Sequence, residues 1–321
     1  MKAAVLEKYG ENPRYREFPD PEPASSSEVV MKVKAAALKN LDKMMATGKS
    51  YVNYEDLPAV TGSDAVGILE DGTKVYARTR GAFAERALID KSKSIPLPDD
   101  ISWATAAALP NAVMGSGLAL KRRAGIEAGD VVLINGGTGV TGKTAIQLAR
   151  YFGAAKVFVT GFVEEIEDEK EELGIDALIS TKEPDEVFLN QLRQLNAASP
   201  ITVVLDYLWG HSVELILQFL AGSDGKFMEH FTRFVQIGSL SGDKIKLSAN
   251  TLRSSKVQII GSGMGSHSAD DFRYLDQELL PEVFELAARG EIKIDTEEGN
   301  LKDITSLWNK PAAGKRWVVM M

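Results

Sequence analysis

The first third of the chain alternates short apolar runs with turn-rich segments. Residues 29–35 and 74–77 are apolar runs of strand length, and the segment 19–23 carries three prolines. This pattern predicts β structure with little helix. One short helix is expected over residues 40–48.

From about residue 112 the pattern changes, and apolar strand-like runs alternate with helix-like segments. Strands are predicted at residues 131–135, 156–160, 177–179, 201–206, 234–238 and 257–261. Helices are predicted directly after residue 139 and over residues 164–173, 186–195 and 212–220. This alternation is typical of a parallel α/β sheet.

The stretch 131–144 contains the strongest functional motif of the chain. Four branched apolar residues are followed by a glycine-rich turn and the start of a helix. Such a turn lets the backbone approach a pyrophosphate, which the amides and the dipole of the helix stabilise. Spaced as G-x-G-x-x-G, it is the fingerprint of a Rossmann unit. Cofactor contacts are expected from Asn135, Gly137, Gly139, Val140, Thr141 and Gly142.

The same stretch also satisfies a second motif. Gly137, four residues and then Gly142, Lys143 and Thr144 match a Walker A loop. Asp206 ends an apolar run and would suit the magnesium ligand of a Walker B strand. Taken alone, this half of the chain is therefore compatible with either a P-loop ATPase or a dinucleotide-binding enzyme.

Composition excludes several classes of protein. The 321 residues carry 37 basic and 45 acidic side chains, a formal charge of −8, which argues against general nucleic-acid binding and anionic lipid surfaces. There is no cysteine, hence no disulfide and no thiolate ligand or nucleophile. No signal peptide or membrane-spanning run is recognisable, so a cytoplasmic protein is expected.

The rest of the chain resembles the medium-chain dehydrogenase/reductases, in particular their zinc-free, quinone-oxidoreductase-like branch. The matching pieces follow the order of that family along the whole chain: Lys2-Ala3-Ala4-Val5, Asn40-Leu41-Asp42 with Gly48 and Tyr51, Gly62-Ser63-Asp64-Ala65-Val66-Gly67, Gly81-Ala82-Phe83-Ala84-Glu85, Ala108-Leu109-Pro110, Ile237-Gly238-Ser239, and Gly314-Lys315 before Trp317-Val318-Val319. The resemblance implies an α/β fold with a GroES-like, β-rich catalytic domain formed by residues 1–111 and 264–321. A Rossmann doubly wound parallel sheet, residues 112–263, is inserted between the two segments, with a cofactor cleft at the junction. The Walker A match is then accidental.

Zinc is not expected. Zinc-dependent relatives need a cysteine and a histidine, but Ser63 stands at the place of the histidine and the chain has no cysteine. His211, His230 and His267 all lie late in the sequence. The resemblance therefore implies hydride transfer from a nicotinamide to a quinone or an α,β-unsaturated carbonyl compound.

Catalytic candidates come from the resemblance. Tyr51 and Asn40 are expected near the substrate carbonyl, where each would stabilise developing negative charge. The plainer alternative is that Tyr51 only packs and Asn40 only caps a helix. Asp64, read without the resemblance, is expected to cap a turn.

Cofactor choice rests on the end of the second strand. Thr160 and Gly161 replace the acid that an NAD enzyme presents to the ribose, which favours NADP(H). Glu164 and Glu165 would repel a 2′-phosphate, so NAD(H) is not excluded. Gly238 and Ser239 complete the expected cofactor contacts. The resemblance also implies a homodimer, and an enoyl-thioester reductase on the same fold is an alternative.

Overall fold

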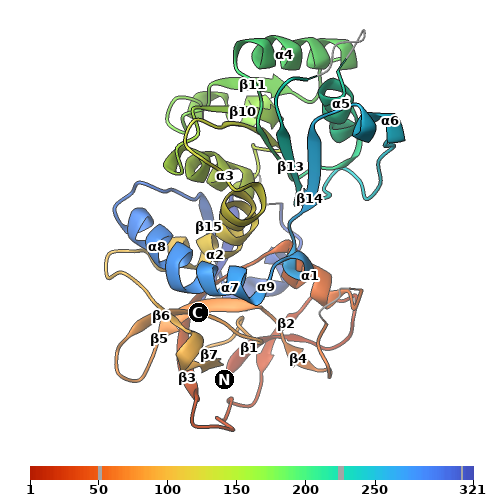
Figure 1. Cartoon of the computed structure of the whole chain (residues 1–321). Coiled ribbons are helices and arrows are strands. Elements are labelled where there is room, and N and C mark those ends of the chain that lie inside the picture. Colours follow the sequence, from red (N-terminus) through yellow and green to blue (C-terminus); the bar gives the residue numbers. More distant parts are fainter. Residues whose placement is uncertain (50–52, 223–227, 312–313) are drawn as a thin grey trace. The chain divides into compact units, whose positions relative to one another are not determined.

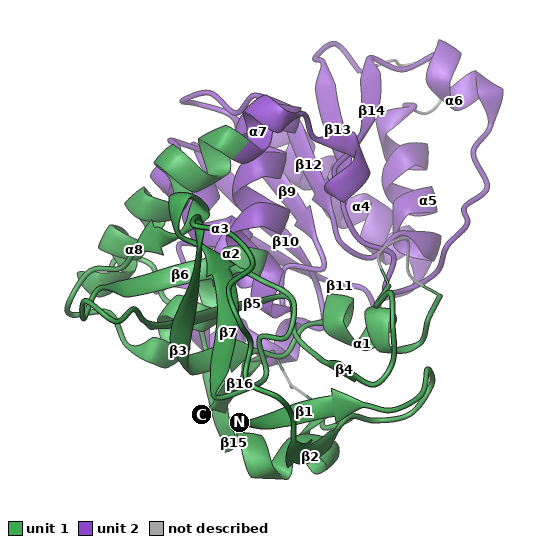
Figure 2. Cartoon of the chain, turned by 90° about the horizontal axis from the view of Figure 1, so that it is seen from below, with its two compact units in different colours: residues 1–111, 273–321 green, residues 112–272 purple. Residues whose placement is uncertain are grey.

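The computed structural model describes residues 1–49, 53–222, 228–311 and 314–321. The chain forms two compact units (Figure 2). Unit 1 joins residues 1–111 with residues 273–321, and unit 2 is the continuous segment 112–272. The second boundary thus lies later than the residue 264 expected from the sequence.

Unit 2 is built on a six-stranded parallel sheet, whose strands are labelled in Figure 2. Its strands, in chain order, are β9 (Val131–Asn135), β10 (Lys156–Gly161), β11 (Ala177–Ser180), β12 (Val203–Asp206), β13 (Thr232–Gln236) and β14 (Val257–Gly261). They pair in the order β11-β10-β9-β12-β13-β14. The chain leaves the central strand β9 toward one edge and returns beside it with β12. This is the strand order of a dinucleotide-binding sheet, in which ligands bind outside the carboxyl ends of the strands where the order reverses.

Helices cover both faces of this sheet because its strands are apolar on both sides. All residues of β9 are buried. Leu133 packs with Phe188 and Ile216 in one core, which helices α4 (Asp185–Ala198) and α5 (Gly210–Leu220) cover side by side (Figure 1). Helix α3 (Val140–Tyr151) packs on β9 and β10. The unit also holds α6 (Ala249–Arg253) and the π-helical turn η2 (Ala119–Ala124), which continues α2 (Trp103–Leu118).

One predicted helix is absent. The prediction of a helix over residues 164–173 was wrong, because only two 3₁₀ turns form there, Val163–Glu165 and Glu167–Glu169. The segment is crowded with acidic residues. On a helix surface their like charges would meet at spacings of three and four residues and destabilise it.

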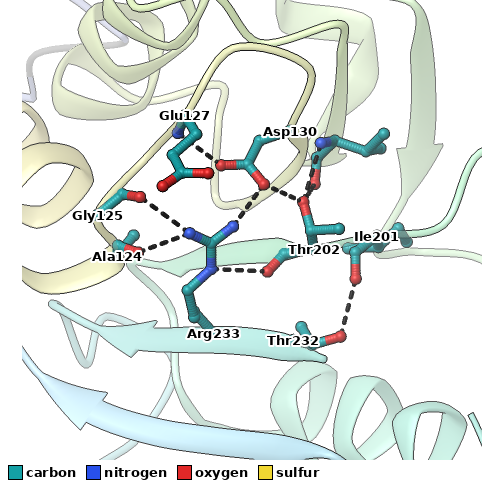
Figure 3. Close-up of polar contacts among 9 residues, drawn as sticks. Ala124, Gly125, Glu127, Asp130, Ile201, Thr202, Thr232 and Arg233 are labelled. Carbon is teal, nitrogen blue, oxygen red and sulfur yellow. Dashed lines mark hydrogen bonds and ion pairs between the residues drawn. The ribbon is translucent and has the colours of Figure 1, made fainter. Parts of the chain in front are cut away.

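At the amino ends of the strands of unit 2, Arg233 ties several elements together (Figure 3). Its guanidinium donates to the carbonyls of Ala124 and Gly125, at 3.0 and 2.9 Å, and forms an ion pair with Asp130. Asp130 in turn accepts hydrogen bonds from the Thr202 hydroxyl at 2.7 Å and from the Glu127 amide at 2.8 Å. The end of η2 and the starts of β9, β12 and β13 are thereby linked.

Unit 1 is β-rich and mainly antiparallel. Its larger sheet runs β15-β16-β3-β5-β6-β8, with β7 also paired to β3, and its smaller sheet runs β2-β1-β4. The strands are β1 (Lys2–Leu6), β2 (Arg14–Glu17), β3 (Glu28–Ala37), β4 (Ala59–Val60), β5 (Asp64–Ile68), β6 (Lys74–Arg78), β7 (Arg86–Asp90), β8 (Ile95–Pro96), β15 (Thr296–Asn300) and β16 (Arg316–Met320). Because β16 pairs with β3, the N-terminal and C-terminal segments of unit 1 share the larger sheet.

Unit 1 carries few helices in its N-terminal segment, as the sequence predicts. The short helix α1 (Asn40–Ala46) forms where it was expected. Helices α8 (Leu280–Ala288) and α9 (Ile304–Leu307) follow in the C-terminal segment, and α7 (Ala269–Tyr274) with the π-helical turn η6 (Leu275–Leu279) spans the unit boundary. Within the described residues, no helix combines the length and the apolar character that a membrane span requires.

Candidate functional site

The turn between β9 and α3 has the form predicted from its glycines. Gly136 adopts a φ of +89°, which glycine tolerates at no steric cost. The amides of Gly136 and Gly137 donate to the carbonyl of Thr160 on β10, at 2.9 and 3.1 Å. These two amides are therefore not available to bind a ligand. Helix α3 starts at Val140 with Gly139 as its N-cap, so the unpaired amides of its first turn remain for an anion.

The three glycines of the motif have different surroundings. A Cβ at Gly137 would come within 2.5 Å of a Val159 methyl, and one at Gly142 would come within 2.5 Å of the Gly136 carbonyl oxygen. Both positions permit close packing of the turn on the sheet and helix. At Gly139 a Cβ would meet no atom closer than 3.9 Å. Its open side is the cradle that a pyrophosphate requires.

A buried polar network lies beneath this turn. The side-chain amide of Asn135 donates to Asp206 at 2.7 Å and to Ser212 at 3.0 Å, and its carbonyl accepts from the Thr160 hydroxyl at 2.6 Å. Asp206 also accepts from the amides of Leu208 and Trp209. Burial raises the pKa of Asp206 above its ordinary value, and these donors offset only part of the effect. The network fixes the ends of three neighbouring strands, and its Asn135, Thr160 and Asp206 side chains are fully buried.

A pocket of about 500 Å³ opens at the carboxyl ends of these strands within unit 2. Its walls come from the glycine turn, the end of β10, the start of α4 and the loops after β12 and β13. The lining is mainly apolar: Gly136, Thr138, Gly139, Gly161, Phe162, Thr181, Glu183, Asp185, Phe188, Leu208, His211, Ser212, Leu215, Leu240 and Ser241. A cleft of this size and character is typical of a cofactor site.

Beside the end of β10, the pocket residue Phe162 contacts a cation that was not predicted from the sequence. Lys182 follows β11, and its ammonium lies 5.0 Å from the centre of the Phe162 ring and 3.2 Å from the Glu164 carboxylate. Neighbouring Thr181 donates its amide to the Gly161 carbonyl at 3.0 Å. A positive and a negative side chain therefore lie together at the end of the second strand, where a dinucleotide places its adenosine ribose.

The geometry of Lys143 and Thr144 does not suit a Walker A loop. The Lys143 ammonium binds both carboxylate oxygens of Glu169, at 2.6 and 2.7 Å. The Thr144 hydroxyl donates to the Val140 carbonyl at 3.0 Å. A P-loop needs this lysine on the phosphates and this hydroxyl on magnesium.

Unit 1 contains a second, separate polar cluster. The buried ammonium of Lys39 forms ion pairs with Asp64 and, at 3.6 Å, with Asp42. Asp42 accepts from the Ser63 hydroxyl at 2.8 Å, and the Tyr76 hydroxyl donates to Asp64 at 3.3 Å. Burial alone would lower the pKa of Lys39, but the two carboxylates outweigh it and raise that pKa. The expectation that Asp64 caps a turn was wrong, because its carboxylate is buried in this cluster.

The remaining predicted site residues lie in different surroundings. Asn40 is exposed and is the first residue of α1, directly after Lys39. Tyr51 lies outside the described residues. Gly238 donates its amide to the Asp206 carbonyl at 3.1 Å, and Ser239 is exposed beside it. Among the described residues, no three acidic, histidine or cysteine side chains are placed to hold a metal ion.

Of the residues predicted to contact the cofactor, Gly139 and Gly161 line the pocket, together with residues that lie outside the glycine motif. Asn135 and Thr160 lie beneath it. Its far wall, formed by Asp185, His211 and their neighbours, was missed. The sequence contained a signal for this wall, because the predicted strands form an open parallel sheet and the loops that follow adjacent strands of such a sheet border one crevice.

Comparisons with known proteins agree with this geometry. No protein-family model matches the chain. A protein of Emericella nidulans named as a probable NADPH-dependent quinone reductase is 25% identical, with 96% of each chain covered. The quinone oxidoreductase of Mus musculus is also 25% identical, over 77% of this chain and 75% of that protein. The solved structure of a mycobacterial quinone oxidoreductase superposes with a TM-score of 0.83 over the full length of both chains at 20% identity, which shows a shared fold.

Proposed function

Because the chain belongs to the medium-chain dehydrogenase/reductase superfamily, in its quinone-oxidoreductase-like branch, we propose that it is an NADPH-dependent reductase of quinones or α,β-unsaturated carbonyl compounds. Unit 2 would hold the dinucleotide. Unit 1 would be the GroES-like catalytic domain.

The cradle at Gly139 carries this proposal. The amides at the start of α3 are unpaired within the helix, the side of Gly139 is open, and the pocket extends from there past Gly161. A pyrophosphate at the helix start would place the adenosine ribose near the end of β10. The residues present therefore fit a dinucleotide.

Lys182 supports NADPH as the cofactor. No acid stands at Gly161 to take the ribose hydroxyls, and the Lys182 ammonium lies against the same strand end. A 2′-phosphate would compete with Glu164 for that ammonium. The relative from Emericella nidulans is named as NADPH-dependent, which agrees with this preference. NADH binding is expected to be weaker.

The bound nicotinamide would supply the hydride. We propose Asn40 and Tyr51 as hydrogen-bond partners of the substrate carbonyl, where they would stabilise an enolate or quinolate. We propose that zinc takes no part, because the chain has no cysteine and the Asp42 and Asp64 carboxylates are already paired with Lys39. The homodimer and the cytoplasmic location stay predictions, and sedimentation tests the first of them.

The decisive experiment compares NADPH, NADH and ATP by fluorescence titration, followed by NADPH oxidation with a panel of quinones and enones. We expect NADPH to bind and to be oxidised by members of the panel. Lys143→Ala should change the dissociation constant of NADPH by less than about threefold, because Lys143 is engaged with Glu169. ATP hydrolysis that disappears in Lys143→Ala would overturn the proposal in favour of an ATPase.

A further inference from the structure

The wall of the pocket opposite the end of β10 carries a histidine-carboxylate pair. Asp185 is the first residue of α4, and His211 lies in the first turn of α5. The His211 Nε2 atom lies 2.8 Å from Oδ1 of Asp185, and both side chains line the pocket. The two are 65% and 56% exposed, so they are accessible to a ligand. Within the described part of the chain, no donor reaches Oδ2 of Asp185.

The place of this pair follows from the proposed function, on which the inference rests. With the pyrophosphate at the start of α3 and the ribose at Gly161, the base must continue into the apolar part of the pocket. That part is formed by Phe162, Phe188, Leu208 and Leu215. Apolar walls suit the faces of a planar base, and only its edge needs polar partners.

We propose that Asp185 and His211 recognise the amino edge of the adenine base, with the Asp185 carboxylate accepting a hydrogen bond from the exocyclic N6 amino group. His211 holds one carboxylate oxygen and leaves the other directed to the ligand. A carboxylate accepts hydrogen bonds and cannot donate them. The pair therefore favours a base with an amino group at this edge and disfavours one with a carbonyl there.

Hypoxanthine provides the direct test, because it replaces the amino group of adenine by a carbonyl oxygen and keeps the size of the base. In the full-length protein, we expect the analogue of NADPH that carries hypoxanthine to bind about five- to tenfold more weakly than NADPH. Asp185→Asn should bring the two dissociation constants within twofold, because the amide can donate to the carbonyl oxygen. His211→Ala should reduce the preference partly, since it frees the carboxylate to turn.

Two acidic neighbours supply matched controls. Glu183→Gln removes the same charge from the pocket lining, and Glu186→Gln removes it from the exposed surface of α4 outside the lining. Both should retain the preference for adenine. If Asp185 acted only through its charge, Glu183→Gln would change the preference equally.

The outcomes separate the two proposals. NADPH binding without a preference for adenine, or a preference unchanged in Asp185→Asn, overturns the base recognition and leaves the proposed reductase intact. Failure of both dinucleotides to bind the wild-type protein overturns both. Circular dichroism of each variant shows whether it is folded, which is expected because Asp185 and His211 are exposed.

Discussion

Gly139 is the N-cap of α3 and Gly142 lies in its first turn, yet their surroundings differ. The side of Gly139 is open, whereas Gly142 is pressed against the backbone of Gly136 and Gly137. We predict that Gly139→Ala leaves the melting temperature within about 2 °C of the wild type, because its methyl group meets no protein atom closer than 3.9 Å and its φ of −79° suits any residue. NADPH affinity should fall at least tenfold, since the methyl group occupies the phosphate cradle.

Gly142→Ala should behave differently. Its methyl group would meet backbone atoms at 2.5 to 2.7 Å, so the turn must move. We expect destabilisation by about 1–3 kcal/mol together with loss of NADPH binding. Thermal unfolding and fluorescence titration of both variants check the pair. Equal loss of stability in the two variants would show that Gly139 is not open, and normal NADPH binding by Gly139→Ala would exclude the cradle.

At the scale of single residues, the sequence predicted those parts of the site that follow a local motif. Glycine spacing is local, so Gly137, Gly139 and Gly142 could be found by pattern alone. Lys182 and Asp185 could not, because both follow β11 and only the order of the strands places Asp185 in the pocket lining and Lys182 against the lining residue Phe162. The ion pair of buried Lys39 with Asp64 likewise results from packing between segments that are distant in the sequence.

Among the elements, Arg233 connects β13 with η2, β9 and β12 (Figure 3). Arg233 and Asp130 have side-chain exposures of only 20% and 9%. We predict that Arg233→Met destabilises the protein by about 2–4 kcal/mol, because it leaves a largely buried carboxylate and two carbonyls without their partner. Urea unfolding measures the change.

An exposed ion pair provides the control. Lys91 and Asp71 are 57% and 51% exposed, and surface pairs contribute little. Lys91→Met should therefore change the free energy of unfolding by less than about 0.5 kcal/mol. If Arg233→Met were equally mild, the contacts of Arg233 would not stabilise the sheet.

Asp176 joins the end of α3 to the start of β10 and gives this region a pH dependence. Burial alone would raise the pKa of Asp176, but hydrogen bonds from Lys156, the Val157 amide and Arg150 outweigh it and lower that pKa. A carboxyl with a lowered pKa stabilises the folded state above its unfolded pKa, near 3.9, and the effect disappears as the pH falls through the folded value.

Asp176→Asn is therefore predicted to lower the free energy of unfolding at pH 7 by about 1–2 kcal/mol. The difference from the wild type should persist down to about pH 5 and shrink below pH 4. Urea unfolding between pH 3 and pH 7 measures it. A difference that stays constant across this range would mean that the carboxylate charge of Asp176 is not stabilising.

Element types were predictable where the apolar pattern is long and regular. The sequence pattern predicts a strand unambiguously for the buried apolar runs of β9, β12 and β13. It predicts a helix in the same way for the apolar stripe of α3. The prediction of a helix over the acidic segment 164–173 was wrong, because the alternation of strands and helices suggested a helix there while repulsion between its acidic side chains opposed one. The order in which the strands pair cannot be predicted from the pattern of any single segment. Its prediction needed the resemblance to a family.

For the whole molecule, the division into units follows from the path of the chain. Unit 2 is continuous, whereas unit 1 needs both ends of the chain. Strand β16 lies between β15 and β3 in the larger sheet of unit 1, and its residues Val318 and Val319 are fully buried. The larger sheet of unit 1 is therefore complete only when residues 316–320 have been made.

Removal of residues 316–321 should consequently affect the two units unequally. The truncated chain loses β16, which leaves β3 and β15 without their partner and exposes the core around Val318 and Val319. Because unit 2 has its own sheet and core, we predict that hydrogen exchange becomes fast in β3, β5 and β6 while the amides of β9, β10 and β12 stay protected. Removal of Met321 alone keeps β16 and should leave both units protected. Loss of protection in both units on the longer truncation would show instead that they fold as one cooperative body, with the sheet of unit 2 dependent on β16.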